Sequence, residues 1–456
     1  MNDSRYDAII VGSGMGGGTL ARALTTQGKH VLLLERGGWL PREPANWDTE
    51  QVFQRGRYGV TEQWVDGIAG KPFTPGEHYN VGGKTKLYGA ALFAARDMNG
   101  LPVGLGRQAA YYQQAKRWYH VHYEPHAPVI ARISDVFTGA GFRPEPAPIG
   151  TIPQQCIMCD KCDGFACPLH AKADAETCGI KPAVDTGLCE VRTGVKVTRL
   201  YRNDAGMIDF IGYETGEGTA RNIPTDGAPV ILAAGAVNSA ALWLRSEIPD
   251  VSDQAGRNYM CHLSSAVLAT GKDVIPPGFH KTLFVPVDGF GTIQMAGQPQ
   301  AGMLKGESAM AHYSPSMMLR EIAERSVTFW LMTEDHPNPD NRVQVLPGGR
   351  IKLTYSPYKG DVSTHDDLYK LLVPHLETMG FHLHMRKRMP LAAVAHQCGT
   401  LRAARHPYDG PVREDGRAYS TGNLYVSDAS VFPRSGEVNP ALTVAAWALR
   451  VAETLK

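Results

Sequence analysis

Residues 6–37 read YDAIIVGSGMGGGTLARALTTQGKHVLLLERG, and this stretch decides the fold. The apolar runs over 8–11 and 31–34 predict two short buried strands. A glycine-rich turn follows the first strand, and a helix is expected over 18–26. Glu35 ends the second strand. This order of strand, turn, helix, strand and acid predicts an α/β unit that binds a dinucleotide.

Each glycine of the turn has its own physical task. Gly12 permits the tight turn, Gly14 lets the backbone approach a pyrophosphate, and Gly17 lets helix and strand pack closely. The start of the helix offers free N–H groups and a partial positive charge to the phosphates. Glu35 is placed to accept hydrogen bonds from ribose hydroxyls. Because the chain contains 49 glycines, the flanking strands and the acid are what make this prediction specific.

The composition bounds the class of protein. The chain has 456 residues, of which 43% are apolar and 20% charged, enough for two or three domain-sized units with a large core. A net charge of +1 gives no attraction to nucleic acid or to an anionic membrane. No apolar run approaches the ~20 residues that span a bilayer. The first residues, MNDSRYDAII, contain no secretory signal, so we expect a cytoplasmic protein whose 8 cysteines are reduced.

A second glycine-rich turn lies in NVGGKTKLYGAALFAAR over 80–96. Gly82 and Gly83 expose the backbone there, so two such turns before residue 100 favour a long ligand that lies over both. The segment PVILAAGAVNSAA over 229–241 predicts a strand that leads into a helix. Small residues at that junction allow the end of the strand to approach a bound ligand.

The middle of the chain has a different character. Residues 262–388 are richer in Met, Pro and aromatic residues, and we expect them to form a separate antiparallel sheet that supplies substrate contacts. Its expected elements are strands over 284–287, 327–333 and 342–355 and a helix over 361–379. Outside this region we expect a helix over 108–118, strands over 191–200 and 207–213, a strand within 423–433 and a helix over 441–455.

A cysteine-rich segment precedes this region. Cys156, Cys159 and Cys162 recur at every third residue, and Cys167 is followed by proline. The pattern is close to the bacterial ferredoxin run CxxCxxCxxxCP, but it has one more residue before the last cysteine. Three interpretations remain open: ordinary buried thiols, which we favour, an iron–sulfur cluster, and zinc. No metal site is therefore assigned.

Six motifs, taken in order, resemble the glucose–methanol–choline (GMC) oxidoreductases, which are FAD enzymes. They are VGSGMGGGTLARAL with its following Glu35, VGGKTKLYGAAL, VKVTRL, ILAAGAVNSA, HQCGT, and NLYVSDASVFP with the later NPALTVAA. The resemblance covers essentially the whole chain. Within the family, the cysteine segment is most similar to a paromamine 6'-dehydrogenase-like subgroup of aminoglycoside biosynthesis, whose members oxidise the primary alcohol of an amino sugar to an aldehyde.

The resemblance implies an α/β fold with two kinds of domain. A discontinuous Rossmann-like FAD-binding domain would comprise residues 1–100, 185–261 and 390–456. An antiparallel-sheet substrate-binding domain would comprise residues 262–389, and residues 101–184 would form a cap and cysteine-rich segment.

The resemblance also implies which residues contact FAD. The glycine turn at residues 12–17 would bind the diphosphate, and Glu35 would bind the adenosine ribose. The strand residue Val197 would contact adenine through its backbone. The remaining contacts would come from the second glycine turn and from the ends of later strands. The full set is Gly12, Gly14, Gly17, Glu35, Gly82, Gly83, Thr85, Gly89, Ala90, Val197, Ala234, Gly235, Asp428, Ala429, Pro440 and Thr443.

The family's catalytic histidine corresponds to His396, and its His-or-Asn partner corresponds to Asn439. Neutral imidazole is an available base near pH 7, so we expect His396 to take the hydroxyl proton while hydride passes to flavin N5. Asn439 would hydrogen-bond the same oxygen. Lys84, Tyr88 and Cys398 depart from the family pattern, which leaves the substrate and some flavin contacts open.

The expected function is FAD-dependent oxidation of an alcohol, a sugar or amino-sugar hydroxyl, to the carbonyl. The electron acceptor, oxygen or another, stays open. One alternative adds an iron–sulfur cluster that passes electrons to a protein or quinone. A second is a non-catalytic flavoprotein, and an NAD-dependent dehydrogenase is a third, which the flavin-type strand ends disfavour.

Overall fold

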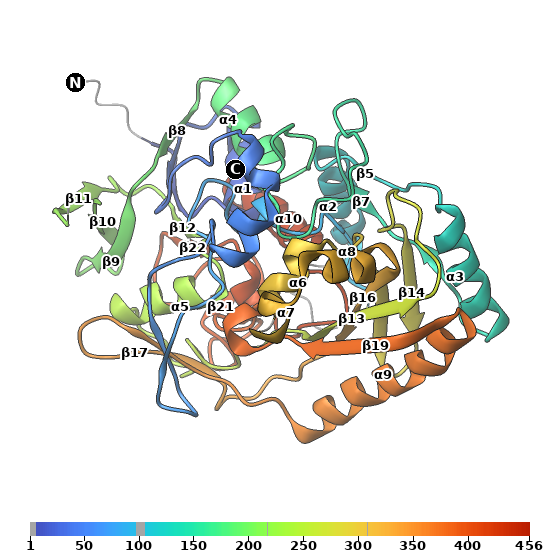
Figure 1. Ribbon diagram of the computed structural model, residues 1–456. Coiled ribbons are helices and arrows are strands. Elements are labelled where there is room, and N and C mark those ends of the chain that lie inside the picture. Colours follow the sequence, from blue (N-terminus) through green and yellow to red (C-terminus); the bar gives the residue numbers. More distant parts are fainter. Residues whose placement is uncertain (1–5, 97–104, 217, 308) are drawn as a thin grey trace.

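A five-stranded parallel sheet organises the opening unit in the computed structural model, which describes residues 6–96, 105–216, 218–307 and 309–456 (Figure 1). Four of its strands are buried and apolar, as expected of a parallel sheet that is covered on both faces, whereas the edge strand at residues 189–192 is polar and partly exposed. In spatial order they are β22 (Leu424–Val426), β12 (Val230–Leu232), β1 (Ala8–Val11), β2 (Val31–Leu34) and β8 (Cys189–Arg192).

The helix of the opening unit is longer than the sequence predicts. Helix α1 (Met15–Thr26) begins directly after the glycine turn, and its leucines and alanines are buried. It packs against the C-terminal helix α10 (Ala441–Thr454) and against the single turn η4 (Glu176–Ile180). Because β2 lies on one side of β1 and β12 on the other, the chain changes direction at β1, and such a switch leaves a crevice at the carboxyl ends of the strands.

A six-stranded antiparallel sheet forms the second unit, as the sequence predicts. Residues alternate along its strands: Val327, Phe329 and Leu331 lie in a core shared with α3 (Pro128–Gly139) and α9 (Lys359–Thr378), whereas Trp330 and Met332 face the other way. The strands are, in order, β19 (Phe381–Arg388), β13 (Leu263–Gly271), β16 (Ser326–Thr333), β15 (Gly291–Met295), β14 (Leu283–Val287) and β6 (Glu145–Pro146).

Residues 342–355 do not join this sheet, so that expectation was wrong. They form the hairpin β17 (Arg342–Val345) and β18 (Ile351–Thr354), which pairs with β3 (Trp64–Asp66) and β4 (Pro72–Phe73) in a separate four-stranded sheet. The apolar side chains of this hairpin pack into the core of the opening unit, and this contact decides its place.

The single strand expected over 191–200 is in fact two strands. Gly194, with φ of +69°, turns the chain in a left-handed conformation and ends β8. The following strand, β9 (Lys196–Arg202), leaves the parallel sheet and pairs with β10 (Ile208–Glu214), which in turn pairs with β11 (Ala220–Pro224). Figure 1 shows this ribbon at the opposite end of the molecule from α3.

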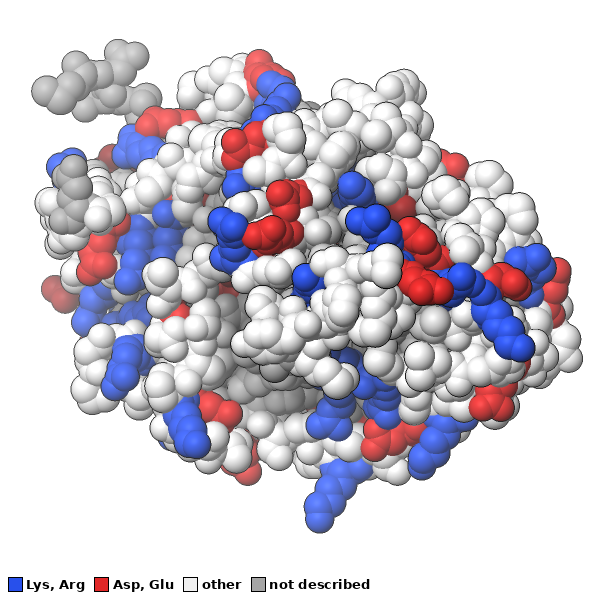
Figure 2. Space-filling model, in the orientation of Figure 1, with Lys and Arg blue, Asp and Glu red and all other residues white. Residues whose placement is uncertain are grey.

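The other elements connect these sheets. They are α2 (Leu105–Trp118), which packs on α10, β5 (Val121–His122), β7 (Ile149–Gly150), α4 (Lys181–Asp185), α5 (Ala236–Arg245), α6 (Ala301–Glu307), α7 (Ala309–Tyr313), α8 (Ser316–Glu324), β20 (Ala403–Ala404) and β21 (Val412–Arg413). Over the described residues, no helix has both the length and the apolar character to cross a membrane. Acidic and basic side chains are interspersed on the face shown in Figure 2, in keeping with the net charge of +1.

Candidate active site

A cavity of about 690 Å³ lies between the two units. One wall is made by the carboxyl ends of β1, β12 and β22, and the other by the inner face of the six-stranded sheet, including Gln294, Trp330 and Met332. Most of the predicted site residues line it: Gly12, Gly14, Glu35, Gly83, Thr85, Gly89, Val197, Ala234, Gly235, His396, Asp428, Ala429, Asn439 and Pro440.

Gly17, Gly82, Ala90 and Thr443 do not line the cavity. They lie one layer behind it. The amide N–H of Gly82 donates to Ser13 Oγ at 3.1 Å, and the carbonyl of Ala90 accepts from the backbone of Gly150. The hydroxyl of Thr443 accepts from Tyr112 at 2.8 Å. Their contacts support the wall residues rather than face the cavity.

The glycine turn is shaped for a phosphate group. A Cβ on Gly12 would lie 2.5 Å from the Ala233 carbonyl oxygen, and a Cβ on Gly17 would lie 1.9 Å from the Gly12 carbonyl oxygen. Both positions therefore accept only glycine, as predicted. Gly14 differs because a Cβ there would meet open space on the cavity side among the described residues. It also begins α1 without a side-chain cap, so N–H groups of the first turn are available to a ligand.

Glu35 is held rigidly at the end of β2. Its Oε2 accepts hydrogen bonds from the backbone and hydroxyl of Ser13, and its Oε1 accepts from the amide N–H of Gly37 at 2.8 Å. Burial raises the pKa of this carboxyl, and the three hydrogen bonds oppose that rise. Oε2 accepts two of these hydrogen bonds and Oε1 accepts one, so the second lone pair of Oε1 can still accept from a ligand hydroxyl.

Asp428 fixes the two strand ends opposite the glycine turn. Its Oδ2 accepts from the Gly235 amide N–H at 3.0 Å and from the Ser239 hydroxyl, while its Oδ1 accepts from the backbone and hydroxyl of Ser430. The carboxylate thus ties the loop after β12 to the loop after β22. This bracing holds Ala234 and Ala429 at the cavity wall.

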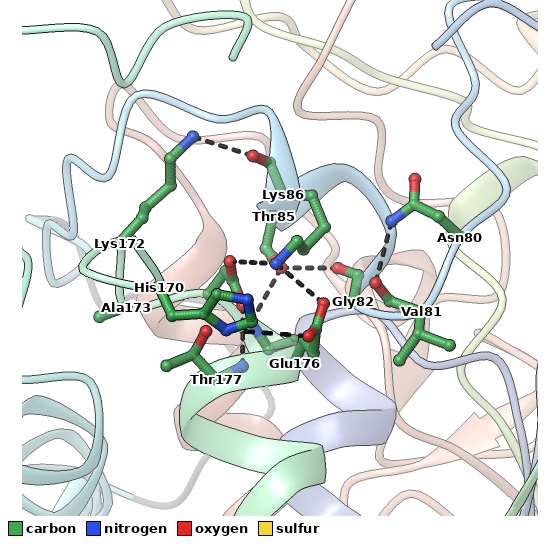
Figure 3. A network of polar contacts seen from close by, with 12 residues as sticks. Asn80, Val81, Gly82, Thr85, Lys86, His170, Lys172, Ala173, Glu176 and Thr177 are labelled. Atoms are coloured by element: carbon green, nitrogen blue, oxygen red, sulfur yellow. Dashed lines mark hydrogen bonds and ion pairs between the residues drawn. The ribbon is translucent and has the colours of Figure 1, made fainter. Parts of the chain in front are cut away.

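The second glycine turn is supported from behind by buried charges (Figure 3). Lys86, which is only 3% exposed, places its Nζ 2.9 Å from Asp174 Oδ2 and 2.8 Å from Glu176 Oε2. Burial opposes the charged form of Lys86, but the two carboxylates outweigh it and raise the pKa of this lysine. In the same figure, the hydroxyl of Thr85 donates to the Gly82 carbonyl at 2.6 Å and closes the turn.

Lys172 joins the turn to the cysteine segment. Its buried Nζ lies within 2.9 Å of four backbone carbonyl oxygens, which belong to Lys86, Tyr88, Cys162 and Phe165. Burial lowers the pKa of this lysine to about 8. Through its four carbonyl contacts, the amino group of Lys172 connects residues 86–88 to residues 162–165.

Of the four cysteines in the CxxC-type run, Cys162 is buried and Cys156, Cys159 and Cys167 are partly exposed. All eight cysteines are free, and burial raises the pKa of Cys162 to about 11, which favours the thiol over the metal-binding thiolate. Over the described residues, no three His, Cys, Asp or Glu side chains are arranged to hold a metal ion. The structure thus gives no support to the iron–sulfur or zinc interpretation of Cys156, Cys159, Cys162 and Cys167.

Backbone geometry brings His396 to the cavity. Cys398 pairs with Met260 in an antiparallel bridge, and the Thr400 hydroxyl donates to the Ala236 carbonyl at 2.6 Å. His396 itself adopts a left-handed φ of +57°, which a non-glycine residue holds only when its surroundings enforce it. His262 lies two residues after Met260 and contacts His396, with the Nδ1 atoms of the two rings 3.0 Å apart.

The electrostatic surroundings keep both histidines neutral. Burial lowers the pKa of His262 to about 4. Burial also lowers the pKa of His396 well below its ordinary value, and the positive charge of Lys84 adds to this effect. A neutral imidazole with a free ring nitrogen can accept a proton at pH 7.

Asn439 precedes α10 and faces the same cavity. Its Oδ1 is buried and has no hydrogen-bond partner within the part of the chain that the structure describes. A buried unsatisfied oxygen is costly, so this atom is suited to a donor supplied by a ligand. The loop that carries it is anchored where the Thr292 hydroxyl donates to the Glu437 carbonyl at 2.9 Å.

The cavity is lined by two ion pairs that the sequence did not predict. Lys281 Nζ lies 2.9 Å from Asp163 Oδ2, and Lys84 Nζ lies 2.8 Å from Glu77 Oε1. Lys84 also donates to the Gln397 side chain, next to His396. Asp163 comes from the cysteine segment, so this segment contributes directly to the wall. No spacing signal in the sequence links these residues, because each pair joins separate turns of the fold.

A dinucleotide fits these observations. The glycine turn leaves backbone N–H groups and open space at one end, and an unpartnered amide oxygen and two neutral histidines line the same cavity. Comparison with known proteins identifies which dinucleotide enzymes share this plan.

Two family models described as GMC oxidoreductase match residues 128–264 and 373–448, and one described as NAD(P)-binding Rossmann-like domain matches residues 10–54. The chain is 27% identical to paromamine 6'-oxidase of Streptomyces fradiae, an alignment that covers 100% of this chain and 92% of that protein. It is 24% identical to 6'''-hydroxyparomomycin C oxidase of Streptomyces lividus, over 99% of this chain and 92% of that one.

Solved structures share the fold. Pyridoxine 4-oxidase from Mesorbium loti has a TM-score of 0.69 at 17% identity, with 99% of both chains covered. A formate oxidase of Aspergillus oryzae has a TM-score of 0.76 at 14% identity, with 100% of this chain and 99% of that chain covered. These structures share the fold, and the family models confirm the resemblance to GMC oxidoreductases that the motifs indicate. The dinucleotide that this family indicates is FAD and not NAD. The chain belongs to the GMC oxidoreductase family and is an FAD-dependent oxidoreductase that acts on alcohols.

Proposed function

We propose that the protein oxidises a hydroxyl group of a sugar or amino sugar to the carbonyl, with His396 as the base. The observation that carries this proposal is that neutral His396 and the unpartnered Oδ1 of Asn439 line one cavity. His396 would take the hydroxyl proton, and the side-chain N–H of Asn439 would donate to the same oxygen and so orient the carbon that bears it. The Oδ1 of Asn439 would then accept from a neighbouring hydroxyl or amino group of the substrate. Bound FAD supplies the acceptor for the hydride.

The polarity of the cavity supports a sugar-like substrate. Beside the two histidines, the wall carries the Asp163–Lys281 ion pair, Gln294 and Ser264. Such side chains offer donors and acceptors to several hydroxyl or amino groups, while Trp330 supplies an apolar face for a sugar ring. The full-length similarity to two oxidases whose names refer to paromamine and paromomycin supports the amino-sugar class.

The test is anaerobic reduction of the bound FAD, followed by the bleaching of its absorbance in a stopped-flow instrument. Amino sugars of the paromamine type, simple aldoses and aliphatic alcohols are compared side by side. We expect the amino sugars to reduce the flavin fastest. If none of these alcohols bleaches the flavin, the protein is a flavoprotein of another kind and the proposal fails.

The role of His396 is tested with His396→Ala, and His382→Ala serves as the control because His382 is exposed on β19, outside the cavity. Loss of a general base is expected to slow flavin reduction by about 10²- to 10⁴-fold while FAD stays bound. Asn439→Ala should slow the same step. Reduction of His396→Ala at the rate of the control would refute the assignment.

The electron acceptor is decided by a separate measurement. Peroxide produced under air in step with substrate oxidation would identify an oxidase. Reduced flavin that persists in air, yet reoxidises with a quinone or dye, would identify a dehydrogenase.

A further inference from the structure

We propose that His262 fixes the tautomer of His396, so that Nε2 of His396 carries the lone pair that accepts the substrate proton. The inference rests on the proposed function, in which His396 is the base. It assigns to His262 the role of a positioning residue: His262 acts on the reaction through the proton arrangement of its neighbour. The argument has three steps, each of which follows from a contact between named atoms.

The first step concerns the far nitrogen of His262. Its Nε2 lies 2.9 Å from the backbone carbonyl oxygen of Ser435. A carbonyl oxygen has no hydrogen to donate, so Nε2 must carry the proton and donate it. The acceptor is fixed in place, because Ser435 Oγ accepts from the Asp335 amide at 2.9 Å and also contacts the Asp335 carbonyl at 3.1 Å.

The second step concerns the charge of His262. The side chain is buried, with the residue only 2% exposed, and burial disfavours the imidazolium form. The charged groups that act on this pair are Glu334, which favours protonation of His262, and Lys84, which opposes protonation of His396. Burial outweighs the carboxylate, so His262 is neutral. A neutral ring protonated at Nε2 has a bare Nδ1 that can only accept.

The third step passes this constraint to His396. The Nδ1 atoms of the two rings are 3.0 Å apart, and the rings meet edge to face at 70°. Since Nδ1 of His262 accepts, Nδ1 of His396 must donate and therefore carries the proton. In neutral His396 the bare nitrogen is then Nε2, which has no hydrogen-bond partner among the described residues. A lone pair on Nε2 is the state a general base needs.

This arrangement is built by the backbone. Met260 and Cys398 form the antiparallel bridge, and the two histidines follow and precede it by two residues. The antiparallel register of this bridge sets position 262 opposite position 396, which brings the two rings together. Without an acceptor at Nδ1, His396 would be free to adopt the tautomer with the proton on Nε2, in which it could not take the hydroxyl proton through that nitrogen.

The direct test reads the tautomer by NMR of protein labelled with ¹⁵N in the histidine rings. The signals of His396 are identified by their loss in His396→Ala, and long-range proton–nitrogen correlations report which nitrogen is protonated. We expect protonated Nδ1 and bare Nε2 in the wild-type holoenzyme at pH 7. A protonated Nε2 on His396 would overturn the inference, whatever the activity of the enzyme.

Two variants extend the test. In His262→Leu, which offers no acceptor, His396 should gain the Nε2-protonated tautomer, and flavin reduction at saturating substrate should slow at least about 10-fold with substrate affinity little changed. His262→Asn, whose Oδ1 can accept from Nδ1, should restore much of the rate. His382→Leu is the control. An unchanged tautomer in His262→Leu would refute the role of His262, whereas normal flavin reduction by His396→Ala would refute the proposed function alone.

Discussion

Replacing Lys86 by methionine should destabilise the protein strongly, by an amount that depends on pH. Lys86 is buried, and its ammonium group is the partner of both Asp174 and Glu176, at 2.9 and 2.8 Å. Methionine fills a similar volume but removes the positive charge that both buried carboxylates contact directly. Breaking a buried pair in this way costs about 3–5 kcal/mol, against a total of about 5–15 kcal/mol for a typical protein.

The assay is thermal unfolding followed by the release of FAD fluorescence. At about 1 °C per kcal/mol for a chain of 456 residues, Lys86→Met should unfold roughly 3–5 °C below the wild type at pH 7. Lys181→Met is the matched control, because Lys181 forms an exposed pair with Asp185, which is worth only about 0.3–0.5 kcal/mol.

The loss of stability in Lys86→Met should depend on pH in a direction set by the pKa of Glu176. Burial already raises the pKa of Glu176 in the presence of Lys86, and removal of the lysine raises it further. A carboxyl whose folded-state pKa is raised destabilises the fold while it is ionised, and the cost is relieved as the pH falls through that pKa. The deficit of Lys86→Met should therefore shrink between pH 7 and about 5.

A triple variant makes the reasoning sharper. Lys86→Met combined with Asp174→Asn and Glu176→Gln removes the uncompensated charges, and the amide oxygen introduced at position 174 can still accept from the Thr177 amide N–H as the Asp174 carboxylate does. Most of the lost stability should return. Unfolding of Lys86→Met within about 2 °C of the wild type, or a deficit that grows toward low pH, would refute the account of this network.

Two further predictions concern the cavity. Lys84→Met removes a positive charge that lowers the pKa of His396, so the pKa of this histidine should rise. The rate of flavin reduction should then begin to fall at a higher pH as the solution is acidified and the base becomes protonated. A stopped-flow pH profile in which this fall does not move would contradict the prediction. Gly12→Ala places a Cβ 2.5 Å from the Ala233 carbonyl oxygen at a φ of +102°, so it should be purified with little FAD, judged by the ratio of flavin to protein absorbance. Gly139→Ala, where a Cβ meets open space, should retain its flavin, and equal retention by both variants would contradict the prediction.

Local patterns in the sequence correctly predicted the unit of strand, glycine turn, helix and strand that ends at Glu35. The strands β1 and β2, the turn at Gly12 and the acid at Glu35 follow each other within about thirty residues, and each is determined by side chains that are neighbours in the chain. The proposed catalytic pair, His396 and Asn439, was different. Only the family motif singled out His396 among 16 histidines, because its burial and its left-handed backbone depend on residues far away.

The remaining parts depend on contacts that a single sequence does not reveal. His262 lies 134 residues before His396, and only the bridge between Met260 and Cys398 brings them together. The hairpin of β17 and β18 was assigned to the wrong sheet because its alternation fits either one, and packing against the core of the opening unit decides between them. Asp163 lies at the cavity because Lys172 binds the carbonyl oxygens of Cys162 and Phe165 on either side of it. Backbone carbonyls are common to all residues, so nothing in the sequence marks them as partners of Lys172.

The order of strands in the parallel sheet also governs how the protein is made. The central strand β1 leaves the ribosome first, yet its neighbour β12 follows more than 200 residues later and β22 closes the edge almost at the end of synthesis. The nascent chain therefore holds an incomplete sheet for most of translation, with its apolar edge unpaired. The cavity wall is complete only after the last strand has been made, because Asp428 braces the loop after β12 only then. A chain that ends before residue 424 lacks this brace, so we expect it to retain little FAD.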